Sequence, residues 1–165
     1  MDPQVTRKFR FRKTGRQSAR ESVIDGQQGR SSFGGESNQM ANVIGQTRWV
    51  IAEGYIPPGS HGPAPEFTSH EAFCILNANH EDAHIELTIF YADRDPVGPY
   101  RFTVKARRTH HYRFNNLHDP EPIPLGTSYA SLFDSDVPVV VQHTRLDSRQ
   151  SKNALMTTIA YPCNS

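Results

Sequence analysis

Alternation of apolar and polar residues along the chain predicts short strands. From Val137 to Val141 every second position is valine, and the same parity then reaches His143 and Arg145. Side chains of an extended strand alternate between two faces, so these residues share one face. A buried face that runs into an imidazole and a guanidinium must supply partners for them, because unpaired buried polar groups cost free energy. This segment is therefore either a binding site or an internal polar clamp.

Similar segments recur after residue 47. Ile85, Leu87 and Ile89 alternate with polar residues, and no window of useful length has helical periodicity. The expected strands are Arg48–Glu53, Glu71–Asn77, Ala83–Tyr91, Tyr100–Ala106, Thr109–Phe114, Ser128–Phe133, Val137–Thr144 and Leu155–Tyr161, with Asp93–Pro99 and Asp134–Asp136 at turns. About eight short strands separated by turns predict an all-β fold, an antiparallel β-sandwich, with a small barrel as the alternative.

The Val137–Val141 segment has valine on both of its faces, because Val140 stands on the opposite parity. Such a strand is expected to be covered on both sides. In a sandwich the core supplies one cover, and another subunit often supplies the second. We therefore expect the protein to be an oligomer.

Charge and composition divide the chain into two parts. Residues 1–45 hold eight Lys or Arg and four Asp or Glu, a net charge of +4, whereas residues 46–165 hold ten and thirteen, a net charge of −3. Residues 1–39 are rich in Gly, Ser and Gln, a composition that predicts disorder. We therefore expect a disordered basic N-terminal extension over 1–43 and one β-sandwich domain over 44–165.

The basic extension contains a candidate nucleic-acid contact. Its cations are interleaved with two phenylalanines, and they are Lys8, Arg10, Arg12 and Lys13. Cations with aromatic rings between them suit a nucleic acid or another anionic surface. The alternative interpretation is a disordered extension that only adds solubility. Because the body of the chain is mildly acidic, a DNA-binding function would depend on this extension.

Neither a membrane span nor a secretory signal is present in the sequence. No stretch approaches the roughly 20 apolar residues that a spanning helix needs. The chain begins without an apolar h-region. Two cysteines, Cys74 and Cys163, are too few for a disulfide framework. These features predict a cytoplasmic protein.

Motifs for catalysis, metals and cofactors are missing. The eight histidines have no zinc-ligand spacing, and the nucleophile elbow, the P-loop and the dinucleotide fingerprint do not occur. We therefore expect no metal, no cofactor and no catalytic residues.

Polar residues at strand ends form a candidate ligand site. An aromatic face that stacks on C–H surface, together with planar donors and acceptors, suits a sugar or another polar metabolite. The candidates are Trp49, Glu53, His70, Glu71, Arg108, Arg113, Asn115, His143, Arg145 and Asp147, with Arg107 beside them. The competing interpretation is that Arg145, Asp147 and the arginines at 107–108 form ion pairs within or between subunits.

Several long motifs resemble the sensory rhodopsin transducer family. They are Trp-Val-Ile-Ala-Glu-Gly-Tyr-Ile-Pro-Pro at 49–58, Ser-His-Glu at 69–71, Cys-Ile-Leu-Asn-Ala at 74–78, Glu-Asp-Ala-His-Ile at 81–85, Pro-Val-Gly-Pro-Tyr-Arg-Phe-Thr-Val-Lys-Ala-Arg-Arg-Thr at 96–109, Arg-Phe-Asn-Asn-Leu at 113–117, Pro-Ile-Pro at 122–124 and Val-Val-Gln-His-Thr-Arg-Leu-Asp-Ser-Arg-Gln at 140–150. The resemblance spans residues 44–162 and does not include the first 40 residues.

The resemblance implies a compact β-sandwich that forms a cyclic homotetramer in the cytoplasm. It implies a membrane photoreceptor, a sensory rhodopsin, as a partner, and DNA binding has been attributed to one member. The wider superfamily has been proposed to bind small molecules such as sugars, and no catalytic residues come with the family.

These observations lead to one main hypothesis, a non-enzymatic cytoplasmic domain for signalling or ligand sensing. It binds a small polar ligand near His143 and Arg145, docks a sensory rhodopsin, or does both. The alternative is a DNA-binding transcriptional regulator that uses the basic extension. A carbohydrate-processing enzyme ranks last, because no motif supports it.

Overall fold

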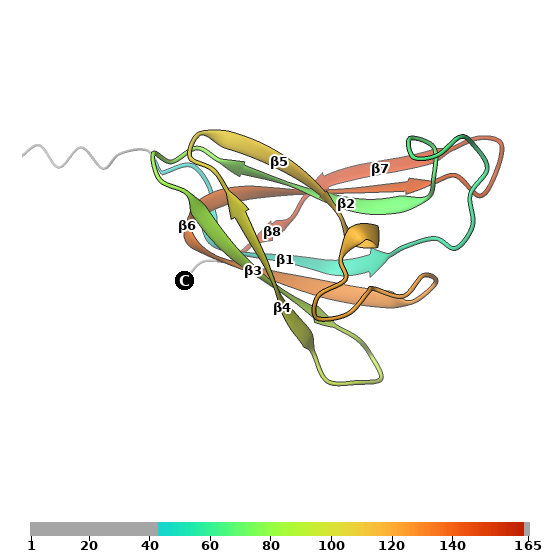
Figure 1. The fold of residues 1–165 in the computed structure, drawn as a ribbon, viewed down its shortest axis with the longest axis horizontal. Helices are drawn as coiled ribbons and strands as arrows, with labels where there is room; N and C mark the ends of the chain where they lie inside the picture. The colour runs from blue at the N-terminus through green and yellow to red at the C-terminus, as the bar shows by residue number, and fades with distance from the viewer. Residues whose placement is uncertain (1–42, 164–165) are drawn as a thin grey trace, which may run out of the picture. The chain divides into compact units, whose positions relative to one another are not determined.

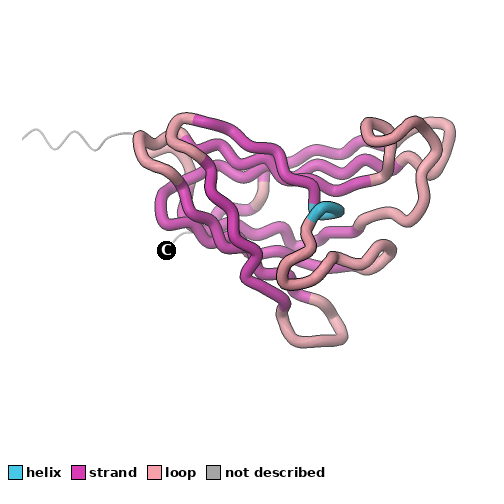
Figure 2. The backbone as a smooth tube through the Cα atoms, viewed as in Figure 1, coloured by secondary structure: helices cyan, strands magenta, loops and turns pink. Residues whose placement is uncertain are grey.

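The computed structural model describes residues 43–163, which form an antiparallel β-sandwich (Figure 1). Its strands are β1 (Gln46–Tyr55), β2 (His70–Asn77), β3 (Ala83–Phe90), β4 (Val97–Val104), β5 (Arg108–Arg113), β6 (Ser128–Asp147), β7 (Ala154–Ile159) and β8 (Tyr161–Pro162). A short 3-10 turn, η1 (Phe114–Asn116), follows β5 and is the cyan segment in Figure 2. The predicted fold class is confirmed. No helix within residues 43–163 is long and apolar enough to cross a membrane.

The long strand β6 belongs to both sheets of the sandwich. In its first half Phe133 faces Trp49 of β1 and Leu87 of β3. In its second half His143 faces Phe73 of β2 and Thr158 of β7. We call the sheet with the order β4-β3-β6-β1-β8 sheet A, and the sheet with the order β5-β2-β6-β7 sheet B. Figure 1 shows the orange ribbon of β6 bending at one end of the sandwich, so that its two halves lie in different sheets.

The expectation of two separate strands at Ser128–Phe133 and Val137–Thr144 is wrong. The structure has one continuous strand, and Asp134–Asp136 lies within it. The acidic side chains are tolerated there because each has a basic partner: Asp134 pairs with Arg48 at 2.6 Å, and Asp136 pairs with His84 at 2.7 Å. The chain bends between the two sheets here without leaving the strand.

The expected strand Leu155–Tyr161 is divided into two. β7 pairs with β6 in sheet B, whereas β8 pairs with β1 in sheet A. The N–H of Ala160 donates to the carbonyl of Val141 at 3.0 Å, at the point where the chain leaves one sheet for the other. β4 also begins three residues earlier than expected, at Val97.

Inward-facing residues of both sheets form the core. Ile85, Leu87 and Ile89 are buried, as their alternation predicts. Phe73 lies at the centre of an aromatic cluster, with its ring centroid 4.7 Å from that of Phe114 and 5.0 Å from that of Phe133. Such ring pairs add about 0.5–1.5 kcal/mol each beyond the area that they bury.

Candidate functional site

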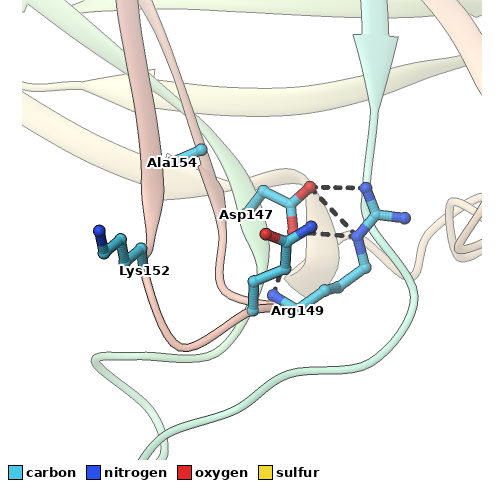
Figure 3. A pocket seen from close by; sticks show the side chains of 5 residues that line it. Asp147, Arg149, Lys152 and Ala154 are labelled. Atoms are coloured by element: carbon cyan, nitrogen blue, oxygen red, sulfur yellow. Dashed lines mark hydrogen bonds and ion pairs between the residues drawn. The ribbon is translucent and has the colours of Figure 1, made fainter.

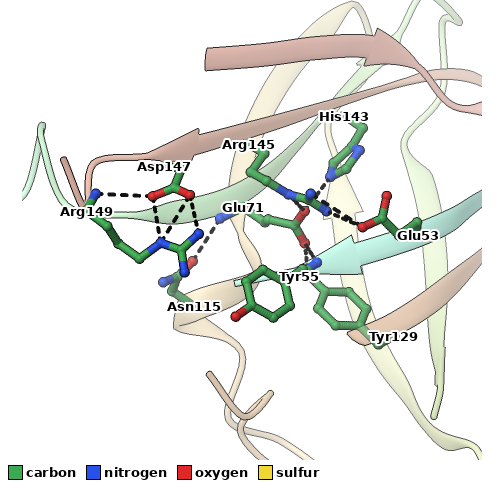
Figure 4. A network of polar contacts seen from close by, with 9 residues as sticks. All are labelled: Glu53, Tyr55, Glu71, Asn115, Tyr129, His143, Arg145, Asp147 and Arg149. Atoms are coloured by element: carbon green, nitrogen blue, oxygen red, sulfur yellow. Dashed lines mark hydrogen bonds and ion pairs between the residues drawn. The ribbon is translucent and has the colours of Figure 1, made fainter. Parts of the chain in front are cut away.

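A buried carboxylate, Glu71, lies among the core residues near one end of the sandwich (Figure 4). Glu71 shares the inward parity of β2 with Phe73, so its side chain points between the sheets. The long strand β6 carries His143 and Arg145 next to β2 in sheet B and Tyr129 in sheet A, and all three side chains reach this space. The strand alternation therefore places one acid and three donors together.

Both oxygens of Glu71 are fully used. Oε1 accepts from Arg145 Nε at 2.6 Å and from His143 Nε2 at 3.1 Å. Oε2 accepts from the Tyr55 N–H at 2.8 Å and from the Tyr129 hydroxyl. We call Glu71, Tyr129, His143, Arg145 and the Tyr55 N–H the Glu71 cluster. A carboxylate with four donors is a stable internal clamp, because each lone-pair direction is satisfied.

The electrostatics of the cluster favour an ionised Glu71. Burial alone would raise the pKa of Glu71, but hydrogen bonds from His143, Tyr129 and Arg145 outweigh it and lower that pKa below its ordinary value. Burial and the nearby Glu71 charge raise the pKa of Tyr129, so its hydroxyl stays a donor. Burial opposes the charge on Arg145, yet the bond to Glu71 and its charge raise the pKa of Arg145.

The cluster reaches the surface through Arg145 and Glu53. The Arg145 side chain is 20% exposed to solvent, and the Glu53 side chain is 72% exposed. Nη2 of Arg145 lies 3.4 Å from Oε1 of Glu53. The Arg145 guanidinium also lies 6.0 Å from the centre of the Tyr55 ring. On the other side, Asn115 of η1 accepts the Glu71 N–H at 3.1 Å and donates to the carbonyl of Ser69 at 3.3 Å. Arg145 therefore connects the exposed Glu53 to the buried Glu71.

Two pockets flank this region. One has a volume of about 430 Å³ and lies at the β6–β7 turn, where Asp147 and Arg149 form an ion pair at 2.6 Å beside Lys152 (Figure 3). The other has a volume of about 260 Å³, lies between β1 and the β7–β8 segment, and is lined in part by Glu53 and His143. We call the second one the inter-sheet pocket.

The structure brings together only some of the candidate ligand residues. Glu53, Glu71, Asn115, His143 and Arg145 form one connected set. Asp147 lies nearby but pairs with Arg149, as Figure 4 shows. Ion pairs of the kind weighed as the competing interpretation are thus present at Arg145 and Asp147.

The other candidates lie elsewhere. Trp49 is buried in the core, where its Nε1 donates to the carbonyl of Val139 at 2.8 Å. His70 is buried with Nδ1 2.7 Å from the carbonyl oxygen of Thr68, and Arg113 donates to the carbonyl of Pro65 at 3.0 Å. Arg108 faces Asn77 at the opposite end of β2 from Glu71. Arg107 and Arg108 make no ion pair with any residue in 43–163.

Sequence reasoning missed Tyr55 and Tyr129. Tyr55 contributes a backbone N–H, which leaves no signal in a sequence. Tyr129 had a usable signal: a tyrosine on the inward parity of an apolar strand needs a partner for its hydroxyl. Within residues 43–163 no three His, Cys, Asp or Glu side chains are grouped so that they could hold a metal ion. The candidate nucleic-acid residues Lys8, Arg10, Arg12 and Lys13 lie outside the described range.

The fold and the Glu71 cluster define this part of the chain as an antiparallel β-sandwich domain with a charged clamp between its sheets. Residues 44–162 match the family model described as Anabaena sensory rhodopsin transducer. The chain belongs to this family, as its motifs indicated.

Two of the solved structures that are similar to the chain show how far the likeness extends. The Anabaena sensory rhodopsin transducer has 65% sequence identity and a TM-score of 0.57, over 62% of this chain and 98% of its own. A crystal structure of Thermotoga maritima 1070 has 36% identity and a TM-score of 0.64, over 71% of this chain and 94% of its own. Among curated proteins, none matches this chain.

Proposed function

We propose that the protein is a non-enzymatic cytoplasmic domain for signalling and sensing. It docks a membrane photoreceptor such as a sensory rhodopsin, binds a small polar ligand such as a sugar, or does both. The observation that carries this proposal is the 65% identity to the Anabaena sensory rhodopsin transducer, which extends over 98% of that protein. Identity at this level over a whole domain supports a shared kind of partner.

The Glu71 cluster supports the ligand part of the proposal. Arg145 and Glu53 bring opposite charges to the surface next to a pocket, and Glu71 connects them to three strands. A ligand acts through such an arrangement only if its affinity differs between two states of the protein. Rearrangement of the Arg145–Glu53 pair supplies that difference, because the pair is half-exposed whereas Glu71 is fixed.

The outward side of sheet B supports a homotetramer. The register of β2, β6 and β7 places uncharged side chains there, namely Leu76, Cys74, Val140, Gln142, Thr157 and Ile159. Ile159 is 56% exposed and Leu155 is 69% exposed, and all six residues of β7 are exposed. A face with this composition suits contact with a second copy of the chain.

Flash photolysis tests the photoreceptor part. The full chain is added to Anabaena sensory rhodopsin in lipid nanodiscs, and the decay of its photocycle is followed as protein is titrated. We expect saturable binding and a changed decay rate. Absence of both binding and a kinetic effect would refute docking to this kind of receptor.

A thermal-shift screen tests the ligand part. Sugars and small organic acids are compared on the wild-type chain and on Arg145→Ala. A ligand of the Glu71 cluster should raise the Tm of the wild type and lose its effect in the variant. A compound that still stabilises Arg145→Ala to the same extent does not use Arg145.

A further inference from the structure

The inter-sheet pocket has a lining whose chemistry selects a class of ligand. It opens at the edge where sheet A ends in β1 and β8 and sheet B ends in β7. Its volume of about 260 Å³ lies just below the usual range for ligand sites, so only a small ligand fits. The lining includes one carboxylate, Glu53, and one imidazole, His143.

The His143 ring is held in a fixed orientation by Glu71. Nε2 lies 3.1 Å from a carboxylate oxygen, which can only accept, so Nε2 carries a proton and donates. In the neutral ring the second nitrogen, Nδ1, is therefore an acceptor. Among the hydrogen bonds of residues 43–163 the His143 ring uses only Nε2, and His143 is one of the residues that line the pocket. His143 thus offers the pocket an acceptor.

Glu53 adds a negative charge at the rim. Its Oε1 is 3.4 Å from Arg145 Nη2, whereas its Oε2 has no hydrogen-bond partner in the part of the chain that the structure describes. Arg145 does not itself line the pocket, because its guanidinium is turned toward Glu71 and Glu53. The pocket therefore offers one carboxylate and one imidazole acceptor. Together they suit a ligand group that carries a positive charge and donates hydrogen bonds.

The remaining walls suit an apolar body. Ile51 and Ala160 are buried at the pocket, and Met156, the register partner of Arg145, is also among its lining residues. The ring of Tyr161 also lines the pocket and is largely exposed, so its face is available to a cation. Besides Glu53 and His143, the polar side chains here are the hydroxyls of Thr158 and Tyr161. A sugar, with hydroxyls all around its ring, would leave several of them against apolar walls.

We propose that the inter-sheet pocket binds a small primary amine in its ammonium form, with a short apolar body. The ammonium group donates to Glu53 and to Nδ1 of His143, and the apolar body packs on Met156, Ala160 and Ile51. An aliphatic amine is protonated at neutral pH, so its charge complements Glu53. This inference rests on the proposed ligand-sensing function and names its ligand class.

Calorimetric titration of the full chain tests the ligand class with three compounds that share a six-carbon chain and differ in their polar group. They are n-hexylamine, n-hexanol and hexanoate, with glucose as a fourth compound. We expect the amine to bind at least tenfold more tightly than the alcohol and the acid. Binding of glucose or hexanoate in preference to the amine overturns the ligand class but leaves ligand sensing in place. Absence of binding by all four compounds overturns this inference, whereas docking to a rhodopsin is tested independently.

Glu53→Gln locates the site. This change keeps the shape of an exposed side chain and removes its charge, and circular dichroism checks that the fold is kept. We expect amine affinity to fall at least tenfold. Glu66→Gln, which alters an exposed carboxylate in the β1–β2 loop by the same amount, should bind like the wild type. Equal amine affinity in Glu53→Gln and the wild type places the amine elsewhere and refutes the assignment.

Discussion

A carboxylate that is shielded from solvent, such as Glu71, needs enough donors to replace its lost hydration. Desolvation of an ionised carboxylate costs several kcal/mol even after the protein has relaxed. Four hydrogen bonds, one of them from a guanidinium, offset this cost. The balance depends on every donor, so the residue tolerates little change.

We expect Glu71→Gln to lower the free energy of unfolding by about 2–4 kcal/mol, because it leaves Arg145 without its buried counter-charge. The amide NH₂ of glutamine also meets a donor at one of the two oxygen positions. Urea unfolding followed by circular dichroism measures the change. The control Glu66→Gln, on an exposed loop, should stay within about 0.5 kcal/mol of the wild type. Equal stability of the two variants would contradict the role of the clamp.

The contribution of Glu71 should also depend on pH. Its pKa in the folded state is below the ordinary value of 4.5, so the folded state binds fewer protons than the unfolded state as acid is added. The stability difference between wild type and Glu71→Gln should therefore be constant above about pH 5.5 and shrink below about pH 4.5. Unfolding curves for both proteins across this range measure it. The exposed carboxylates are the same in the wild type and in Glu71→Gln, so their titration cancels in the stability difference. A stability difference that grows as the pH falls would contradict a lowered pKa of Glu71.

At this scale the sequence predicted much of the site. The parity that begins at Val137 placed His143 and Arg145 on the inward face, and both lie there. Glu71 was among the candidates, but its central position follows only from the pairing of β2 with β6. Local alternation shows which face a residue takes, not which strand lies opposite, so Arg108 and Glu71 looked equivalent although they lie at opposite ends of β2.

Among the elements, β6 departs most from the prediction. Val139 is the partner of Gln46 in sheet A, and Val140 is already the partner of Leu76 in sheet B. Pro138 stands at this change of partners, where a missing N–H costs least. A proline and two aspartates in five residues look like a loop in the sequence. The structure tolerates them because the strand bends there and its acidic side chains find partners across the sheet.

The end of β2 is fixed to its surroundings by Asn77, which is fully buried. Its Nδ2 donates to the carbonyls of Glu81 and Val104 at 2.8 and 3.0 Å, and its Oδ1 accepts from the Asn79 N–H at 3.0 Å. We expect Asn77→Ala to cost about 2–3 kcal/mol of unfolding free energy, because buried carbonyls lose their donor. Asn116→Ala, at an exposed position, should change stability little, and chemical denaturation compares the two.

On the scale of the whole domain, the outward faces of the two sheets differ. Sheet A carries a row of charges in which Arg101 pairs with Glu86 at 3.0 Å and Arg48 pairs with Asp134 at 2.6 Å. Glu86 and Asp134 are register partners in the middle of this row. The outward side of sheet B is uncharged over β2, β6 and β7. Such asymmetry favours contact between copies through sheet B and solvent over sheet A.

We therefore expect Ile159→Lys to break a homotetramer into smaller species, because it places a charge on the uncharged face, at its β7 edge. Phe90→Lys puts the same charge on an exposed apolar position of sheet A and should leave the assembly intact. Analytical ultracentrifugation measures both, and circular dichroism confirms that each variant is folded. Dissociation by Phe90→Lys alone would assign the interface to the other sheet.

The sharing of β6 has a consequence for how the protein is made. β1 pairs only with β6 and β8 among the described strands, and both are synthesised much later. Before β6 has left the ribosome, the β3–β4 and β2–β5 ladders can form, but the two sheets have nothing to join them. The apolar faces of β1, β2 and β3 therefore stay exposed to solvent until residue 147 has left the exit tunnel. Stalled nascent chains that end before Ser128 should be cut readily by protease, and released full-length chains should resist it.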